Sequence, residues 1–333
     1  MKPGKGLCYL LIGAVALMLQ CCIHDYPRPV SGFSSKPGVD PTTVDAYLQV
    51  SYDLTWENIL HRIGYSTKAQ NANMYRFVVE VLEKDSVVCH DVMRMSGEEF
   101  SLGELRHRIS TPLGNKLYQI AVWFENQSDD GSYFFNTDRL SEVVHLDNST
   151  TTASTIQCGY AVDYLDLREV STKEESVIKE LEMNHVGAKF EIVATDIQEF
   201  IKSKRDALLQ GEEYRLKLTM SWPMSQCFSL YGNNYVIRDG SNLDFSGPLR
   251  LPYADYDELK IAEVFIFCRN EDNANVSLSV TDSSLSTVVK TSEFTIPIKR
   301  GFITTVKGDF LMNNVGSVLG VDNVWDEEIL IEI

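Results

Sequence analysis

Histidine, cysteine and carboxylate side chains carry much of protein chemistry, and in this chain their spacing matches no catalytic motif. The six histidines are scattered, and none forms an H-x-x-x-H pair, so the helical zinc site is absent. The phosphate loop, the dinucleotide fingerprint and the nucleophile elbow are also missing. Acidic pairs such as Asp129 with Asp130 lack the spacing of a calcium loop. We therefore expect no enzyme activity, no metal and no cofactor, and we interpret the acidic clusters as solvated loop charges.

The cysteines beyond residue 22 are widely spaced and form no C-x-x-C motif; they are Cys89, Cys158, Cys227 and Cys268. An exported protein can form disulfides. The apolar runs around Cys227 and Cys268 favour buried free thiols instead. Neighbouring side chains on a strand point to opposite faces, so Cys89 and His90 are expected to be a core thiol beside an exposed imidazole.

Residues 1–22 have the pattern of an export signal that ends in two cysteines. Lysines precede an apolar run at residues 7–19, which is shorter than the ~20 residues of a spanning helix and is typical of a secretory signal peptide. The run ends in Leu-Gln-Cys-Cys at residues 19–22, which is similar to a bacterial lipobox, in which the cysteine becomes the lipidated first residue. We predict lipid attachment at Cys22. Cys21 is the alternative, and an ordinary signal peptide without lipidation is another.

The charge of the chain excludes two classes of partner. The 333 residues carry a formal net charge of −17, which becomes −19 when the basic leader is removed. Nucleic-acid binding and adsorption to anionic lipid both need a basic surface, so we expect neither. Lipid chains, at ~0.8 kcal/mol per buried methylene, can hold such an acidic domain at a membrane. Residues 22–45, rich in Pro, Gly and Ser, form the expected tether.

Most of the remaining chain alternates between apolar and polar residues. At residues 74–82, Tyr75, Phe77, Val79 and Val81 fall on one face. Similar alternation occurs at residues 117–124, 214–220, 276–280 and 329–333. Such alternation is typical of half-buried antiparallel sheets and favours β-sandwiches.

Helical signals are few. Residues 174–183 have helical composition, and residues 197–209 look like a crossover helix whose start is capped by Thr195 and Asp196. The polar stretch between the two strand-rich regions places a domain boundary near residue 180. The expected divisions are a signal peptide at 1–21, a tether at 22–45, and β-sandwich domains at 46–180 and 181–333.

Several short motifs occur in a characteristic order. They are Cys22 with His24-Asp25-Tyr26-Pro27, residues 118–123, residues 133–137, residues 187–196, residues 307–311 and residues 329–333. Together they resemble the fimbrillin-like lipoproteins of Bacteroides-type bacteria, a family that includes fimbrial anchor subunits. The resemblance runs along nearly the whole mature chain.

This resemblance implies an all-β protein with two tandem transthyretin-like antiparallel β-sandwich domains and few short helices. It implies a non-enzymatic subunit of a fimbrium (pilus), with a role in pilus assembly and cell adhesion, attached by lipid, palmitate included, to the outer membrane at the cell surface. The implied partners are fimbrial shaft or accessory subunits, joined by strand addition.

The resemblance also implies that polymerising members of the family are cut near the N-terminus, and Arg62 and Arg76, in the first strand region, are the candidate cut sites. A chain that keeps its lipid cannot also lose its N-terminus, so we predict an anchor or base subunit. Two alternatives stay open: a surface lipoprotein that stacks glycans on Trp123 and Trp222, and an unrecognised enzyme.

Overall fold

The computed structural model describes residues 43–52, 57–58, 74–100, 102–170, 176–221, 225–236, 242–252, 256–312 and 330–332. The expected signal peptide, Cys21, Cys22 and most of the tether lie outside these residues. Residues Thr42–Ile333 make up one compact unit. The division into domains near residue 180 therefore stays a prediction.

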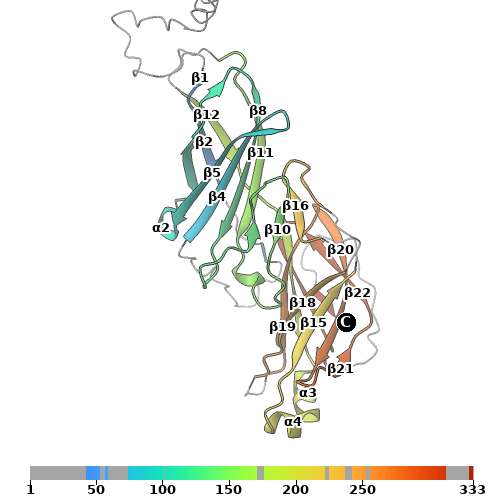
Figure 1. The fold of residues 1–333 in the computed structure, drawn as a ribbon. Helices are drawn as coiled ribbons and strands as arrows, with labels where there is room; N and C mark the ends of the chain where they lie inside the picture. Colours follow the sequence, from blue (N-terminus) through green and yellow to red (C-terminus); the bar gives the residue numbers. More distant parts are fainter. Residues whose placement is uncertain are drawn as a thin grey trace, which may run out of the picture. The chain divides into compact units, whose positions relative to one another are not determined.

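Two facing sheets occupy the first part of the structure (Figure 1). The larger has five strands in the order β13-β11-β8-β4-β5, with every neighbouring pair antiparallel. Its strands are β4 (Met74–Glu83), β5 (Ser86–Ser96), β8 (Leu117–Asn126), β11 (Cys158–Asp166) and β13 (Asn184–His185). The smaller sheet has the order β12-β2-β6, with β2 (Ala46–Ser51), β6 (Glu104–Arg108) and β12 (Val177–Glu182). A separate pair joins β1 (Thr43–Val44) to β7 (Leu113–Gly114), and a short helix α2 (Gly97–Phe100) follows β5.

The first hydrophobic core lies between these sheets and follows the predicted alternation. Tyr75, Phe77, Val79 and Val81 of β4 all face it, as do the even-numbered residues of β8 from Tyr118 to Phe124. Period-two side chains reach one face of a strand, so this half of the prediction is confirmed.

Two further sheets form the second part of the structure. One has the order β19-β14-β23-β24, with β3 also pairing to β23; the other has the order β18-β15-β20-β21, with β22 also pairing to β20. The first is built from β3 (Glu57–Asn58), β14 (Gly187–Ala194), β19 (Leu259–Phe267), β23 (Phe302–Gly308) and β24 (Leu330–Glu332). The second is built from β15 (Arg215–Met220), β18 (Leu243–Pro248), β20 (Glu271–Thr281), β21 (Thr287–Lys290) and β22 (Phe294–Lys299).

The second core lies between this pair of sheets. It contains the predicted inward residues of β15 and β20, from Leu216 to Met220 and from Val276 to Val280. The predicted fold class, all-β with two sandwiches in tandem and few short helices, is confirmed. Not every strand pair is antiparallel, however: β2 with β12, and β23 with β14, β24 and β3, run parallel.

The expected crossover helix between β14 and β15 is present as α3 (Ile197–Ser203) and α4 (Arg205–Leu209). The predicted cap is wrong. The carboxylate of Asp196 does not cap the helix but accepts hydrogen bonds from the backbone N–H groups of Leu311 and Met312, at 2.8 and 2.6 Å. A contact more than one hundred residues away in sequence has displaced the local one.

The helix expected at residues 174–183 is also wrong, because the described part of this stretch is strand β12. Leu181 and Met183 point into the first core, while Ile178 and Glu180 face solvent. Buried and exposed side chains therefore alternate every second residue, as on a strand. Helical composition is a weak preference, and pairing along the whole of β2 outweighs it.

A third apolar cluster joins the two sandwiches. A small sheet of order β17-β16-β10-β9 combines strands from both halves of the chain: β9 (Phe135–Asn136), β10 (Val143–His145), β16 (Cys227–Ser229) and β17 (Asn234–Tyr235). Val78, Ala121 and Trp123 on the outer face of the first large sheet pack with Phe265 and Phe267 of β19. The central strands of that sheet are thus buried on both faces, which the expectation of half-buried sheets did not include.

A strap at residues 147–152, followed by the one-turn helix η1 (Ala153–Thr155), connects the edges of the second sandwich. The carbonyl of Asn148 accepts from Ser246 N–H of β18, and the carbonyl of Thr150 accepts from Glu263 N–H of β19, both at 2.8 Å. The strap therefore satisfies backbone groups on one edge strand of each sheet.

Gly247 of β18 lies under this strap with no room for a side chain. A Cβ there would collide with Oγ1 of Thr150, whereas the Cβ of Thr150 would stay 3.6 Å away. We expect Gly247→Ala to lower the free energy of unfolding by about 1–3 kcal/mol, as overpacking does. In a Thr150→Ala background the same substitution should cost little, because the colliding oxygen has gone. That oxygen is buried and has no hydrogen-bond partner in the part of the chain that the structure describes. Urea unfolding of the four variants measures this coupling, and additive effects would contradict it.

Candidate functional site

The first candidate site is the groove between β12 and β6, which β2 fills. β2 is the middle strand of the smaller sheet, parallel to β12 and antiparallel to β6. Ala46, Leu48 and Val50 are buried at its inner face, with Leu48 and Val50 fully covered. Without β2, the sheet would separate into two unpaired strands over an exposed apolar core. In this structure the chain fills that groove with its own N-terminal strand.

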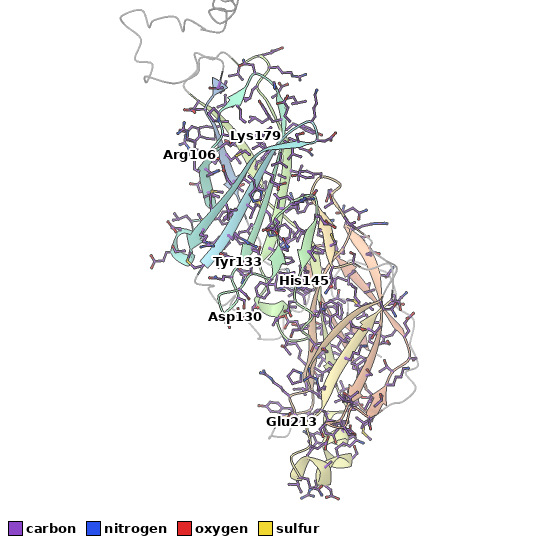
Figure 2. All side chains as sticks on the ribbon, in the orientation of Figure 1. Arg106, Asp130, Tyr133, His145, Lys179 and Glu213 are labelled. Carbon is purple, nitrogen blue, oxygen red and sulfur yellow. The ribbon has the colours of Figure 1, made fainter. Side chains whose placement is uncertain are left out.

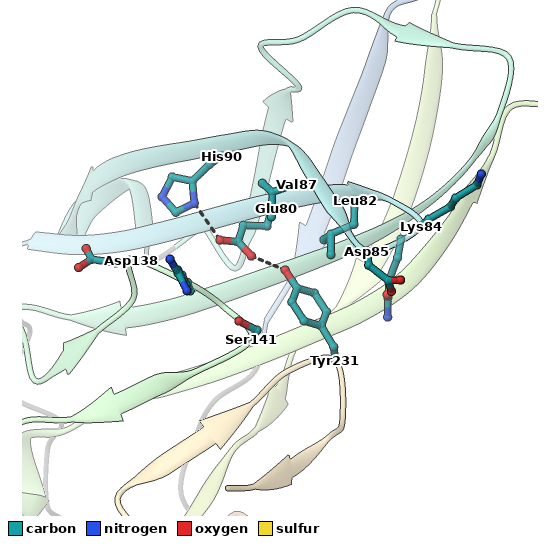
Figure 3. Close-up of a pocket in the computed structure, with 11 residues that line it drawn as sticks. Glu80, Leu82, Lys84, Asp85, Val87, His90, Asp138, Ser141 and Tyr231 are labelled. Carbon is teal, nitrogen blue, oxygen red and sulfur yellow. Dashed lines mark hydrogen bonds and ion pairs between the residues drawn. The ribbon is translucent and has the colours of Figure 1, made fainter.

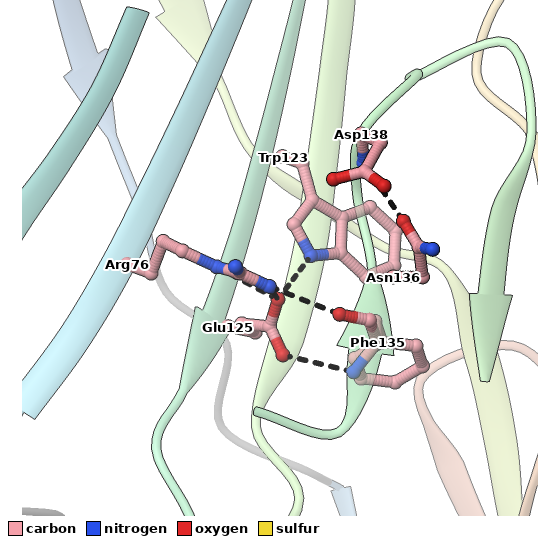
Figure 4. Close-up of polar contacts among 6 residues, drawn as sticks. All are labelled: Arg76, Trp123, Glu125, Phe135, Asn136 and Asp138. Carbon is pink, nitrogen blue, oxygen red and sulfur yellow. Dashed lines mark hydrogen bonds and ion pairs between the residues drawn. The ribbon is translucent and has the colours of Figure 1, made fainter. Parts of the chain in front are cut away.

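Arg76 lies on β4 in a buried polar cluster (Figure 4). Its guanidinium binds Oε1 of Glu125 through two nitrogens, one of them Nε at 3.2 Å, and also donates to the carbonyl of Phe135 at 3.0 Å. Glu125 is fully buried and accepts further bonds from the Phe135 N–H and the Trp123 indole, at 3.2 and 3.3 Å. Burial raises the pKa of Glu125 to about 7, although Arg76 opposes the rise.

This cluster is structural. The ring of Tyr133 packs against the guanidinium of Arg76, with 3.8 Å between the guanidinium carbon and the ring centroid, and covers one face of it. Arg76 is thus held in the middle of a sheet, between β5 and β8. It does not fit the predicted role of a proteolytic cleavage residue. Arg62, the other predicted cleavage residue, lies outside the described residues.

A second buried carboxylate, Glu80, lies on the same face of β4 (Figure 3). Its oxygens accept hydrogen bonds from the Tyr231 hydroxyl and from the Leu140 N–H at 3.3 Å, and His90 Nδ1 lies 3.0 Å from Oε1. Burial and the neighbouring Glu80 raise the pKa of Tyr231, so its hydroxyl stays a donor. The bond between β4 and Tyr231 joins the two halves of the chain at this point.

His145 of β10 is buried in the third apolar cluster, between the rings of Phe135 and Phe265 (Figure 2). Its Nε2 has no hydrogen-bond partner among the described residues. Burial lowers the pKa of His145 from 6.5 to about 4 and outweighs the opposing charge of Asp147.

The native state therefore keeps this imidazole neutral at pH values where the unfolded chain is protonated. We expect the unfolding free energy to fall by about 3 kcal/mol from this residue as pH drops from 6.5 to 4, at 1.36 kcal/mol per pKa unit. The measurement is the difference in stability between the wild type and His145→Leu across that range. Parallel pH curves for the two proteins would contradict the assignment.

Strand β5 is an edge of its sheet, and within the described residues it pairs only with β4. It is 11 residues long and exposes Val87 at 50% and Val92 at 52%. Partly buried apolar side chains of the first core also gather beside it, namely Val88, Met93 and Met95 of β5, Phe100 of α2 and Leu105 of β6. A long edge strand with apolar side chains is a ready template for pairing with another chain.

The seam between β5 and β6 is crossed by a polar bridge. The carboxylate of Asp91 on β5 accepts from the Ser110 N–H at 2.9 Å and lies 2.9 Å from Nε2 of His107 on β6. Hydrogen bonds from Ser110 and His107 hold the pKa of Asp91 below its usual value despite its partial burial. The bridge fixes the spacing of the two edges while leaving β5 unpaired on its outer side among the described residues.

A family profile matches residues 41–333 of this chain. The chain belongs to the DUF6562 family. The family is described as one of unknown function, so membership by itself assigns no activity. No curated protein matches the sequence of this DUF6562 chain.

Among solved structures, this DUF6562 chain is similar to the fimbrial anchor protein Mfa2 from Porphyromonas gingivalis, with 13% identity and a TM-score of 0.41 over 74% of this chain and 81% of that one. It is also similar to a fimbrial assembly protein from Parabacteroides distasonis, with 14% identity and a TM-score of 0.36 over 80% and 90% of the two chains.

The thiols of the DUF6562 chain behave as predicted. Cys89, Cys158, Cys227 and Cys268 are free and buried. Cys89 faces the first core, while His90 lies on the opposite face and is exposed, as expected for strand neighbours. Burial raises the pKa of the Cys158, Cys227 and Cys268 thiols, which keeps them protonated.

The other predicted features of the DUF6562 chain differ in their outcome. Trp123 is completely buried, so it is not available for stacking on a glycan; Trp222 lies outside the described residues. Asp130 accepts hydrogen bonds from Ser128 and Ser132 and shapes a turn.

Over the described residues, no group of three or more His, Cys, Asp or Glu side chains is placed to hold a metal. Where the structure is described, its helices are too short or too polar to cross a bilayer.

Sequence reasoning missed the two buried carboxylates. Glu80 falls on the face opposite Tyr75 and Phe77 in the predicted strand at residues 74–82, and Glu125 lies one residue beyond the predicted strand at residues 117–124. The signal available was the apolar residues beside them on the same face, such as Val78 and Trp123, which indicate that this face is also covered.

Proposed function

We propose that this protein is a surface lipoprotein that forms the base of a fimbrium and docks the next subunit by strand addition. The observation that carries the proposal is β2, which fills the centre of the smaller sheet. A subunit with this groove filled by its own N-terminal strand has no need of a donor strand there, and keeps the segment that precedes β2. That segment contains the predicted lipid attachment at Cys22.

The edge of β5 is the proposed docking strand. Backbone hydrogen bonds give affinity in strand addition, and side-chain contacts along the edge give specificity. β5 offers both, because its outer side is unpaired among the described residues and Val92 is exposed. The acidic charge of −17 disfavours binding through basic patches, which leaves this apolar edge as the better interaction surface.

Intact mass of the membrane-extracted protein tests retention of the N-terminus. We expect a chain that begins at Cys22 and carries lipid, and we expect Cys22→Ala to release the protein from the membrane. A mature chain that begins just after Arg62, without lipid, would overturn the base-subunit proposal.

Photocrosslinking in intact cells tests the docking edge. A photoreactive residue at Val92 should capture a fimbrial subunit, and Val92→Lys should reduce subunit recovery because charge on an edge strand opposes pairing. The control is a photoreactive residue at Leu209, which is 77% exposed on α4 of the second sandwich. Equal capture from both positions, or recovery of carbohydrate-uptake proteins without fimbrial subunits, would count against fimbrial docking.

A further inference from the structure

A pocket of about 470 Å³ lies on the face of the first large sheet that contains Glu80. Its floor comes from β4 and β5 through Leu82 and Val87, and its sides come from Gln119 of β8, from residues 138–141 and from Tyr231 (Figure 3). The volume is within the ~300–1,000 Å³ range of small-molecule sites. Because Tyr231 comes from the second half of the chain, both halves contribute to the pocket.

The base of the pocket is rigid. The Glu80 carboxylate is held by Tyr231, by Leu140 N–H and by His90, so both of its oxygens already have partners within the protein. These bonds fix the ring of Tyr231 and the side at residues 138–141 relative to β4. The pocket is therefore formed before any ligand enters, which reduces the entropic cost of binding.

The rim is different, because its polar side chains have no hydrogen-bond or ion-pair partner among the described residues. They are Lys84, Asp85, Gln119, Asp138, Arg139 and Ser141. Lys84 also holds a φ of 56° at the first position of the two-residue turn between β4 and β5, where Gly or Asn would be unstrained. A lysine at that position keeps a long side chain at the pocket despite its backbone cost.

The chemistry of the rim selects the class of ligand. Lys84 and Arg139 are balanced by Asp85 and Asp138, so neither a simple anion nor a simple cation is favoured. The amide of Gln119 and the hydroxyl of Ser141 can each donate and accept. Sugar hydroxyls also do both, and the apolar C–H face of a pyranose suits Leu82, Val87 and the aromatic ring of Tyr231.

We propose that this pocket binds a neutral saccharide unit at the end or along the side of a glycan. The hydroxyls bond to the rim side chains while the sugar ring packs on the apolar floor. The pocket lies on the face of the sheet, whereas strand addition would use the outer backbone edge of β5, so the two activities can be measured independently.

The experiment is binding of the full-length, detergent-solubilised protein to an array of neutral oligosaccharides and uronate-containing oligosaccharides, followed by calorimetry with the best neutral ligand. We expect wild-type binding, a loss of at least about tenfold for Arg139→Ala, and a smaller loss of roughly threefold to tenfold for Gln119→Ala, because a hydrogen bond from a charged group is worth more than one from a neutral amide. Arg215→Ala is the matched control, because Arg215 is an exposed arginine on β15 of the second sandwich.

Melting temperatures of the variants check that the fold is retained. Absence of binding to every neutral oligosaccharide, or equal binding by wild type, Arg139→Ala and Gln119→Ala, would overturn the proposal. Preference for uronate chains would overturn the neutral class of ligand. Because photocrosslinking at Val92 reports on subunit docking alone, failure of the sugar site and failure of the docking edge give different results.

Discussion

Cutting the chain between β2 and β3 will make β2 exchangeable with an added peptide of the same sequence. A specific protease site inserted within residues 53–56 allows the protein to fold first and to be cut afterwards. The cut segment is then held by non-covalent contacts alone: the pairing of β2 with its two neighbours, the pairing of β1 with β7, and burial of Ala46, Leu48 and Val50. We expect a fluorescent peptide of residues 43–52 to enter the cut protein and to stay out of the uncut one.

Single substitutions in that peptide should separate the buried face from the exposed one. Leu48 is fully buried, whereas Gln49 is partly exposed on the opposite face of β2. A Leu48→Asp peptide should fail to enter, because burying an unpaired carboxylate costs several kcal/mol. A Gln49→Asp peptide should still enter. Two outcomes would show that β2 does not fill a separable groove. In one, both the Leu48→Asp and the Gln49→Asp peptides enter; in the other, neither enters and the unmodified peptide is excluded as well.

Removing Arg76 will cause the largest loss of stability among single charge changes in the first sandwich. Arg76→Met leaves Glu125 fully buried without its cation, and breaking a buried pair in this way costs about 3–5 kcal/mol. The double variant Arg76→Met with Glu125→Gln should recover much of this loss, because the uncompensated charge is then absent. Arg94→Met is the control, since Arg94 lies directly opposite on β5 but is exposed.

The sign of the pH dependence gives an independent check on this pair. Because burial raises the folded-state pKa of Glu125 from 4.5 to about 7, the folded chain binds a proton that the unfolded chain has released. The contribution of Glu125 to stability is present below pH 4.5 and is lost as pH rises toward 7. The loss should appear as a falling difference between the wild type and Glu125→Gln in chemical unfolding. A rising difference would mean that the ion pair with Arg76 outweighs burial.

Glu125 and His145 should therefore act in opposite directions over much of the same pH range. The total stability of the wild type can be nearly flat with pH even though each residue has a slope of its own. Only comparison with the single variants separates the two, and for that reason both predictions are framed as differences.

The sequence patterns predicted the inward faces of β4, β8, β15 and β20 because alternation is a local property that any half-buried strand shows. They did not predict β12, whose conformation depends on pairing with β2 more than one hundred residues earlier. They also missed the cluster around Trp123, because a strand buried on both faces needs a second layer that only the folded chain supplies. The conformation of β12 and the burial of Trp123 depend on contacts between residues far apart in the sequence, and local alternation carries no information about such contacts.

The candidate sites divide in the same way. The free cysteines and the separation of Cys89 from His90 followed from apolar context and strand geometry. The polar contacts of Arg76 and Glu80 did not, because their partners Phe135, in the two-residue strand β9, and Tyr231, in a turn, lie far along the chain. The predicted attachment at Cys22 rests on the leader alone and stays a prediction.

The central position of β2 also has a mechanical consequence. If the chain is pulled from its N-terminal side, the load enters along the axis of β2, whose hydrogen bonds to β12 and β6 run across that axis. Such a pull shears the bonds of both ladders together instead of opening them one at a time. Rupture then requires many bonds to fail at once, so the strand that completes the first sandwich is also well placed to resist tension applied through the segment that precedes it.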